Sequence, residues 1–230
     1  MLIRHGQSSS NLAWSQRQEI SGDEDPALTE LGQAQAIALA GAFADGRLPR
    51  PDHLMTSLMR RAVQTVAPLA QFLDMPVRGL AGVHEVGGVC RGAWDGDRQP
   101  RPGLGRAELL ALCPQLTLGD DVTHEGWYHK PVESRAEGWT RASVVAGQLL
   151  DEFGGTDDLV AIVCHGLLMN LLIRALIGWQ PDMSEPVLDV WFEISNTGTV
   201  LVSVPGGSGD RVRVYWLNRT DHLAAGQTTV

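Results

Sequence analysis

The sequence contains little cysteine, no excess of basic residues and no long hydrophobic run. Its three cysteines, Cys90, Cys113 and Cys164, lack the spacing of a CxxC motif or a metal site, and their odd number argues against a disulfide framework. We therefore expect a reducing, cytoplasmic setting. No segment approaches the roughly 18 apolar residues of a membrane span, and the N-terminus lacks the charged-then-apolar pattern of a signal peptide. These absences predict a protein without a membrane partner.

The charge balance limits the class of ligand. The chain carries 18 Lys and Arg residues against 27 Asp and Glu, a net charge of −9. Non-specific binding to nucleic acid needs a basic surface, so we expect no nucleic-acid partner. An anionic ligand must instead be held by a local cluster of Arg and His. The length of 230 residues and the 43% hydrophobic content allow a full core, which predicts one α/β domain.

Strand-like and helix-like segments alternate along the chain, as in βαβ units. We expect helices at residues 29–44, 59–72, 106–112, 133–153 and 167–177, and strands at residues 1–3, 53–57, 159–164, 187–194, 199–204 and 211–217. Residues 87–102, rich in Gly, Arg and Asp, are expected to form a long functional loop. Residues 97–131 are polar, contain Trp and His, and interrupt the alternation, which predicts a loop-like or cap-like insertion.

Two His-Gly pairs each follow a predicted strand. Arg4-His5-Gly6 follows the first strand, and His165-Gly166 follows the strand at residues 159–164. Ligands bind at the carboxyl ends of the strands in open α/β sheets, so the two histidines are placed to converge in one pocket. A guanidinium matches phosphate oxygens, and glycine lets backbone amides approach an anion. The alternative for each histidine is a local structural role, satisfied by backbone hydrogen bonds.

Five sequence blocks resemble the histidine phosphatase superfamily, which includes cofactor-dependent phosphoglycerate mutases and many broad phosphatases. In family order they are Leu2-Ile3-Arg4-His5-Gly6-Gln7-Ser8 with Asn11, residues 25–36, residues 56–65, Glu85 with residues 92–96, and residues 163–166. The resemblance implies a phosphoglycerate mutase-like fold, a three-layer α/β/α sandwich with a mostly parallel central sheet. It also implies a single histidine phosphatase domain over residues 1–230.

The resemblance further implies a phosphatase that works through a phosphohistidine. His5 is the nucleophile, and Glu85 is the general acid and then the general base. Phosphoryl transfer depends on preorganised positive charge, which a clamp of Arg4, Arg61 and His165 would supply. The full set of expected phosphate-binding residues is Arg4, Asn11, Gly22, Arg61, His165 and Gly166. No metal ion or other cofactor is expected.

Several assignments have alternatives. Arg60 competes with Arg61, because neighbouring helical residues point about 100° apart. His84 is an alternative proton carrier to Glu85, although substrate placement is the favoured role.

The neighbourhood of the acid has its own open points. The separation between Glu85 and Gly92 is longer than in many members, and Asp95 replaces the more usual Glu of the Trp-Glu-Gly element. Asp23, Glu24 and Asp25 are expected to form a solvated turn.

The inserted residues 97–131 bear on the pocket and on metal binding. Trp127 and Tyr128, with His124 and His129 beside them, are candidates to line the pocket. Two histidines five residues apart, without acidic companions in register, make a poor metal site.

Three functions fit these residues. Hydrolysis of a small phosphorylated metabolite is preferred. Phosphoglycerate mutase chemistry is the first alternative, but residues 97–112 carry Arg98, Arg101 and Arg106 without the Arg-Tyr-Lys-Gly-like run of such mutases. A module that binds a phosphorylated ligand without turning it over is the second, and it would need neither His5 nor Glu85. The sequence is also compatible with a homodimer.

Overall fold

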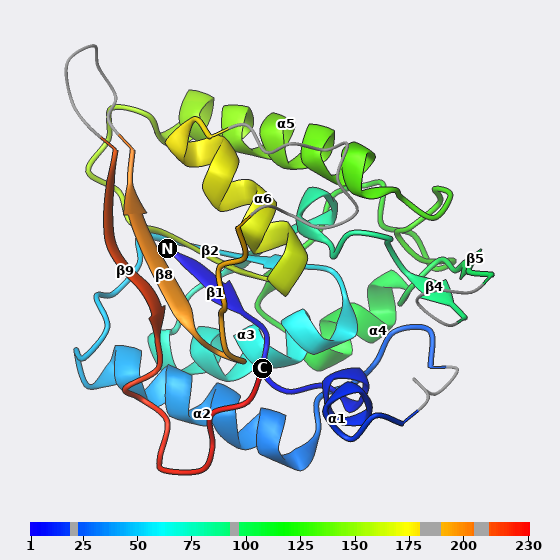
Figure 1. Cartoon of the computed structure of the whole chain (residues 1–230), viewed down its shortest axis with the longest axis horizontal. Coiled ribbons are helices and arrows are strands. Elements are labelled where there is room, and N and C mark those ends of the chain that lie inside the picture. Colours follow the sequence, from blue (N-terminus) through cyan, green and yellow to red (C-terminus); the bar gives the residue numbers. More distant parts are fainter. Residues whose placement is uncertain (19–22, 93–96, 180–189, 205–211) are drawn as a thin grey trace.

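The protein folds into three layers in a computed structural model that describes residues 1–18, 23–92, 97–179, 190–204 and 212–230. Helices α5 (Arg135–Phe153) and α6 (Gly166–Ile177) cover one face of a central sheet. Helices α2 (Glu30–Ala44) and α3 (Arg60–Leu73) cover the other face (Figure 1). The expected α/β/α sandwich is therefore confirmed.

The central sheet is mostly parallel. Its strand order among the described residues is β6 (Leu116–Thr117), β3 (Val77–Leu80), β2 (His53–Ser57), β7 (Val160–Cys164), β1 (Leu2–Arg4), β8 (Thr199–Ser203) and β9 (Arg213–Arg219). The first five of these run parallel to their neighbours, and β8 and β9 are antiparallel. Arg4 pairs with Cys164, and Thr56 pairs with Val163, so the carboxyl ends of β1, β7 and β2 lie side by side.

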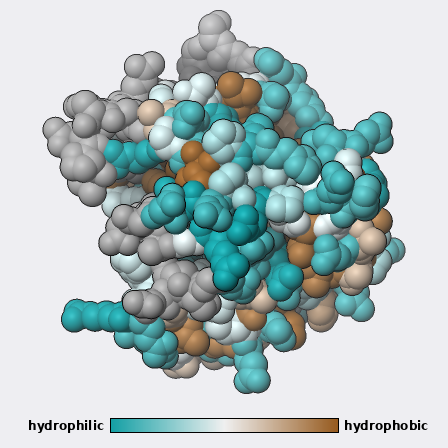
Figure 2. All heavy atoms as spheres, turned by 90° about the vertical axis from the view of Figure 1, so that its right-hand side faces the viewer, coloured by the Kyte–Doolittle hydropathy of each residue, from teal (hydrophilic) through white to brown (hydrophobic). Residues whose placement is uncertain are grey.

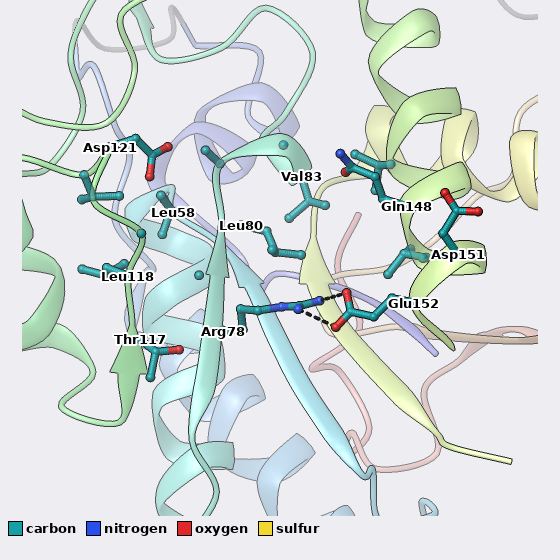
Figure 3. A pocket seen from close by; sticks show the side chains of 17 residues that line it. Leu58, Arg78, Leu80, Val83, Thr117, Leu118, Asp121, Gln148, Asp151 and Glu152 are labelled. Atoms are coloured by element: carbon teal, nitrogen blue, oxygen red, sulfur yellow. Dashed lines mark hydrogen bonds and ion pairs between the residues drawn. The ribbon is translucent and has the colours of Figure 1, made fainter. Parts of the chain in front are cut away.

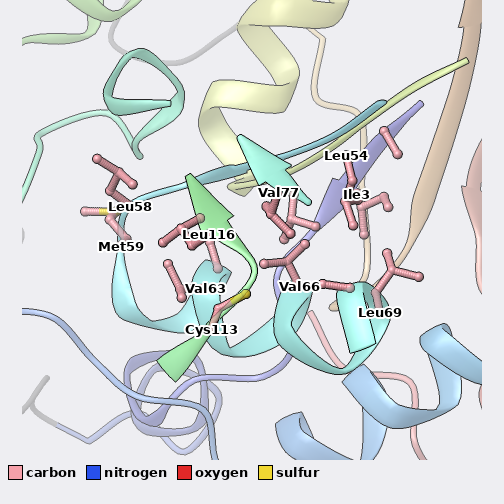
Figure 4. Packing of buried hydrophobic residues seen from close by; sticks show 14 of the residues in the cluster. Ile3, Leu54, Leu58, Met59, Val63, Val66, Leu69, Val77, Cys113 and Leu116 are labelled. Atoms are coloured by element: carbon pink, nitrogen blue, oxygen red, sulfur yellow. The ribbon is translucent and has the colours of Figure 1, made fainter. Parts of the chain in front are cut away.

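The central strands are apolar because they are buried on both faces. Ile3 and Val163 belong to the core beneath α2 and α3, whereas Leu2 and Ile162 belong to the core beneath α5 and α6. Figure 4 shows the first core, where side chains of α3 and of the strands gather between helix and sheet. Removing such side chains leaves cavities and destabilises the fold. The packing of both helical layers therefore keeps the central strands in place.

Several short elements were not predicted. Strands β3 and β6 and helix α1 (Ser9–Ser15) are only two to seven residues long, too short for a periodic signal. Helix α4 (Arg106–Leu112) was predicted, and residues 87–102 contain a small hairpin of β4 (Cys90–Arg91) and β5 (Gln99–Pro100). Within residues 97–131, β6 joins the edge of the main sheet beside β3. A 3₁₀ turn, η1 (Ala81–Val83), follows β3.

The strand predicted at residues 187–194 is wrong for its described part. Residues 191–194 lie in no strand. The Asn170 side chain accepts the N–H of Phe192 at 2.8 Å and donates to its carbonyl at 3.0 Å, so a side chain replaces the strand partner. Residues 187–189 lie outside the described residues. No helix in the described ranges is long and apolar enough to cross a bilayer.

The contact between the loop after β1 and helix α2 gives a stability prediction. A Cβ atom at Gly32 would lie 2.0 Å from the carbonyl oxygen of Gln7, whereas one at Gly41, in the same helix, would meet nothing within 4 Å. We expect Gly32→Ala to lower the free energy of unfolding by about 1–3 kcal/mol, because the loop must move. Gly41→Ala should raise it by about 0.5–1 kcal/mol. Urea denaturation measures both, and equal midpoints for the two variants would contradict this packing.

Candidate active site

His5 lies directly after β1 and has one ring nitrogen tied to the backbone. Its Nδ1 is 2.7 Å from the carbonyl oxygen of Gly6. A carbonyl can only accept, so Nδ1 carries the hydrogen and Nε2 keeps its lone pair. The N–H of Gly6 donates to Thr65 Oγ1 at 3.0 Å, which fixes the loop on α3. Burial, together with the Arg61 and Arg4 guanidiniums, lowers the pKa of His5 well below its usual range, so the ring is neutral.

Arg61, rather than Arg60, contacts His5. The Arg61 Nε donates to His5 Nε2 at 3.1 Å, and the residue is buried in the first turn of α3. Burial lowers the pKa of Arg61, against the charges of Asp25 and Glu85. The Arg61 guanidinium therefore lies directly against the unprotonated nitrogen of His5.

Asp25 is buried and does not form the solvated turn that was expected. Its two carboxylate oxygens each accept the N–H of Arg60 at 3.0 Å, and Oδ1 lies 3.8 Å from Arg61 Nη1. Met59, at the N-cap position of α3, supplies no side-chain cap, so Asp25 caps this helix from a distant loop. That missing cap is the sequence signal that could have identified Asp25.

His165 lies beside His5 at the junction of β7 and α6. The two rings have centroids 5.1 Å apart, and His165 Nε2 is 2.8 Å from Ser57 Oγ at the end of β2. His165 is fully buried. Burial, with Arg61 adding a like charge, lowers the pKa of His165 well below its usual range, so it too is neutral.

Arg4 completes a group of four residues, with His5, Arg61 and His165. Its Nη1 donates to the carbonyl of Ile194 at 2.6 Å, and its buried Nε has no partner among the described residues. A Cβ atom at Gly166 would lie 3.5 Å from that Nε, which places the guanidinium over the start of α6. Burial lowers the pKa of Arg4, opposed by the charges of Glu85 and Glu193.

Glu85 lies at the N-terminus of α6, next to His165. Its Oε1 accepts the N–H groups of Val86 and Leu168 at 2.9 and 3.0 Å, and its Oε2 accepts that of Leu167 at 3.2 Å. Arg141, from α5, donates to the carbonyl of His84 at 3.0 Å and so holds the turn that carries Glu85. The acid candidate is thus placed by two helices.

Other predicted residues lie farther out or serve the scaffold. Asn11 Oδ1 accepts from Ser8 and, at 3.2 Å, from Asn196, whose amide also donates to the carbonyl of His5 at 3.0 Å. His84 packs against Trp127 and Tyr128, and burial lowers its pKa to about 4.

The remaining predicted residues do not reach the site or are not described. His124 and His129 are exposed. Gly22, Trp94 and Asp95 lie outside the described residues. Within the described ranges, no three His, Cys, Asp or Glu side chains are grouped to hold a metal ion.

A separate cavity of about 900 Å³ lies between β3, β6 and α5. Figure 3 shows Leu58, Leu80 and Val83 facing it, and Arg78 making a two-pronged ion pair with Glu152 at 2.7 and 2.8 Å. Its lining includes no histidine, and its one arginine is already paired. The donors that a phosphate needs are at the histidine pair instead.

The face at the carboxyl ends of the parallel strands is hydrophilic over most of its described area (Figure 2).

The protonation of Asp25 gives a stability prediction. Burial raises its pKa from 3.8 to about 6. Between these values the folded protein holds a proton that the unfolded chain has lost, so wild-type stability falls as the pH rises through this window. Between pH 5 and pH 7.5, the free energy of unfolding of wild type should fall by about 1 kcal/mol relative to that of Asp25→Asn. Urea denaturation at both pH values measures this. Substitution of the exposed Asp157 (Asp157→Asn) is the control and should follow wild type. A constant difference between wild type and Asp25→Asn would contradict a raised pKa.

Comparisons with known proteins agree with this geometry. The family model described as "Histidine phosphatase superfamily (branch 1)" matches residues 1–216. A glucosyl-3-phosphoglycerate phosphatase of Mycolicibacterium vanbaalenii is 30% identical over 195 residues, covering 82% of this chain and 77% of that protein. A 2,3-bisphosphoglycerate-dependent phosphoglycerate mutase of Mycobacterium leprae is 38% identical over 81 residues, 34% of this chain and 31% of the mutase.

Solved structures show the same fold. A mycobacterial glucosyl-3-phosphoglycerate phosphatase in complex with VO3 has a TM-score of 0.60 at 27% identity, covering 94% of this chain and 97% of the other. A phosphoserine phosphatase mutant of Entamoeba histolytica, in complex with phosphoserine, has a TM-score of 0.60 at 22% identity, covering 97% and 98%. The family match over nearly the whole chain and the paired histidines at the strand ends lead to one conclusion: the chain belongs to the histidine phosphatase superfamily.

Proposed function

We propose that the protein is a metal-independent phosphatase that hydrolyses phosphate monoesters through a phosphohistidine on His5. The observation that carries the proposal is the state of the His5 ring. Its Nδ1 is bound to the carbonyl of Gly6, and the lone pair of its Nε2 faces the Arg61 guanidinium at 3.1 Å. A neutral imidazole whose unprotonated nitrogen lies beside a cation is a nucleophile suited to an anionic electrophile.

The phosphoryl group would bind where the guanidiniums of Arg4 and Arg61 meet His165. Arg61 Nε then donates to a phosphoryl oxygen instead of His5 Nε2, which frees the lone pair for attack. The buried Arg4 Nε supplies a second donor. In such a water-poor site, preorganised donors stabilise the charge of the transition state more strongly than they would in water.

Hydrolysis then takes two steps. In the first, His5 Nε2 bonds to phosphorus, the bond to the leaving oxygen breaks, and Glu85 gives that oxygen a proton. In the second, water attacks phosphorus, the bond to His5 breaks, and Glu85 takes a proton from the water. Oε2 is the oxygen best placed to carry the proton, because it accepts a single N–H, at 3.2 Å, whereas Oε1 accepts two.

The substrate proposed is a small phosphorylated metabolite. Two relatives named glucosyl-3-phosphoglycerate phosphatases match 77% and 82% of the chain, whereas the matched mutase segment covers 81 residues, 34% of the chain. These coverages favour hydrolysis over mutase chemistry, in which the phosphoryl group returns to the substrate. A pure binding module would have no use for a nucleophile such as the unprotonated Nε2 of His5.

Substitution of the reacting residues tests the proposal. With p-nitrophenyl phosphate, His5→Ala should lower kcat/KM at least about 10³-fold, since the covalent step is lost. Glu85→Gln should lower it about 10²- to 10⁴-fold. His53→Ala is the matched control, because His53 pairs with Asp158 on the surface and should keep full activity. Equal rates for wild type and His5→Ala would refute the enzyme assignment.

Chelation tests the metal-free mechanism separately. Since the proposed donors are Arg4, Arg61 and His165, wild-type activity should be unchanged after dialysis against EDTA. Complete loss in EDTA, with recovery on adding a divalent cation, would replace this mechanism with a metal-assisted one.

A further inference from the structure

Ser57 lies beside His165 at the carboxyl ends of the parallel strands. It is the last residue of β2, and it and His165 are both fully buried. Ser57 Oγ is 2.8 Å from His165 Nε2, within ordinary hydrogen-bond distance. The bond joins two strand ends of the parallel sheet, since β2 pairs with β7 along its length.

The direction of this bond follows from counting hydrogens. The N–H of Met59 also donates to Ser57 Oγ, at 3.2 Å, and no other partner of Oγ is found among the described residues. A serine hydroxyl has one hydrogen to donate. If that hydrogen goes to His165 Nε2, the Ser57 hydroxyl donates to His165 and accepts from Met59, so both of its contacts are hydrogen bonds.

The opposite direction leaves two groups unpaired. Were Nε2–H to donate to Ser57, the serine hydrogen would have no acceptor among the described residues. The lone pair of His165 Nδ1, a buried atom with no partner within the described ranges, would be unpaired as well. An unpaired buried polar group destabilises the folded state, because it has lost its hydrogen bonds to water. The first direction leaves only an Nδ1–H, which is a donor that an anion can use.

Burial keeps the His165 ring neutral, and the positive charges of Arg61 and Arg141 add to this effect by opposing a second proton. A neutral imidazole donates from one nitrogen only, so the tautomer decides whether the nitrogen facing an anion can donate a hydrogen bond to it. The two nitrogens point in widely different directions, so the bond from Nε2 to Ser57 turns Nδ1 away from Ser57.

We propose that Ser57 is a positioning residue that holds His165 as the Nδ1–H tautomer, so that a neutral His165 donates to the phosphoryl group. The donation to a phosphoryl group rests on the proposed function, whereas the tautomer itself does not. Loss of the serine hydroxyl would let His165 adopt either tautomer. In the wrong one, a lone pair replaces the donor beside the bound anion.

Nitrogen NMR of the full chain tests the tautomer directly. In protein labelled with ¹⁵N-histidine, long-range ¹H–¹⁵N spectra distinguish a protonated ring nitrogen from an acceptor, and His165→Gln assigns the signals. We expect wild-type His165 to be protonated at Nδ1 with Nε2 as acceptor. Ser57→Ala should remove this preference, and Ser57→Thr, which keeps a hydroxyl, should retain it. Thr56→Val is the control, because the Thr56 hydroxyl donates to the carbonyl of Ser57 and does not contact His165.

Kinetics supply the second readout. In Ser57→Ala, kcat/KM for p-nitrophenyl phosphate and the affinity for inorganic phosphate should each fall roughly tenfold, the cost of one lost hydrogen bond to a charged group. Thr56→Val should show neither change. Protonation of wild-type His165 at Nε2, or an unchanged tautomer in Ser57→Ala, would overturn the inference. If Ser57→Ala does not fold, the spectra of wild type and Ser57→Thr still decide. Wild-type protein without phosphatase activity would refute the proposed function while leaving the tautomer measurable.

Discussion

The hydrogen bond from His5 Nδ1 to the carbonyl of Gly6 controls the chemistry of the whole site. It places the ring hydrogen on one nitrogen and leaves the lone pair on the other, 3.1 Å from Arg61. The loop after β1 packs closely against α2. It requires glycine there, since a Cβ at Gly6 would lie 2.6 Å from the carbonyl oxygen of Gly32. The packing of a loop against α2 therefore sets the reactive state of a histidine.

Three strand ends bring the remaining groups to this histidine. Parallel pairing of β1, β7 and β2 places Arg4, Ser57 and His165 at the same ends of their strands. His165 is more than a hundred residues away from the other two in the sequence. The helices that follow these strands add Arg61 and the N–H groups that hold Glu85. Two guanidiniums and two imidazoles are thus buried together, and Asp25 and Glu85 offset part of the cost of that burial.

The sequence was most informative where its signals are local. A buried strand followed by His-Gly predicted both histidines at one sheet edge, and helical periodicity predicted α2, α3, α5 and α6 to within two residues at each end. The resemblance to the family motif Arg-Ala-x-Gln-Thr also favoured Arg61 over Arg60. Signals that depend on distant partners were lost. Asp25 read as a surface turn because its partner, the uncapped start of α3, lies 35 residues away. Residues 191–194 are apolar enough for a strand, but Asn170 binds their backbone. The bond between Ser57 and His165 likewise needs the sheet register, which no local pattern contains.

Membership of the superfamily and the geometry of the four central residues both support the proposal of covalent catalysis at His5. The most direct measurement is mass spectrometry of wild-type protein quenched in base during turnover of p-nitrophenyl phosphate, because a phosphorylated histidine is labile in acid. The account predicts a phosphoryl group on the peptide that contains His5, absent from His5→Ala. Phosphate release with His5 unmodified, or a phosphoryl group on another residue, would contradict it.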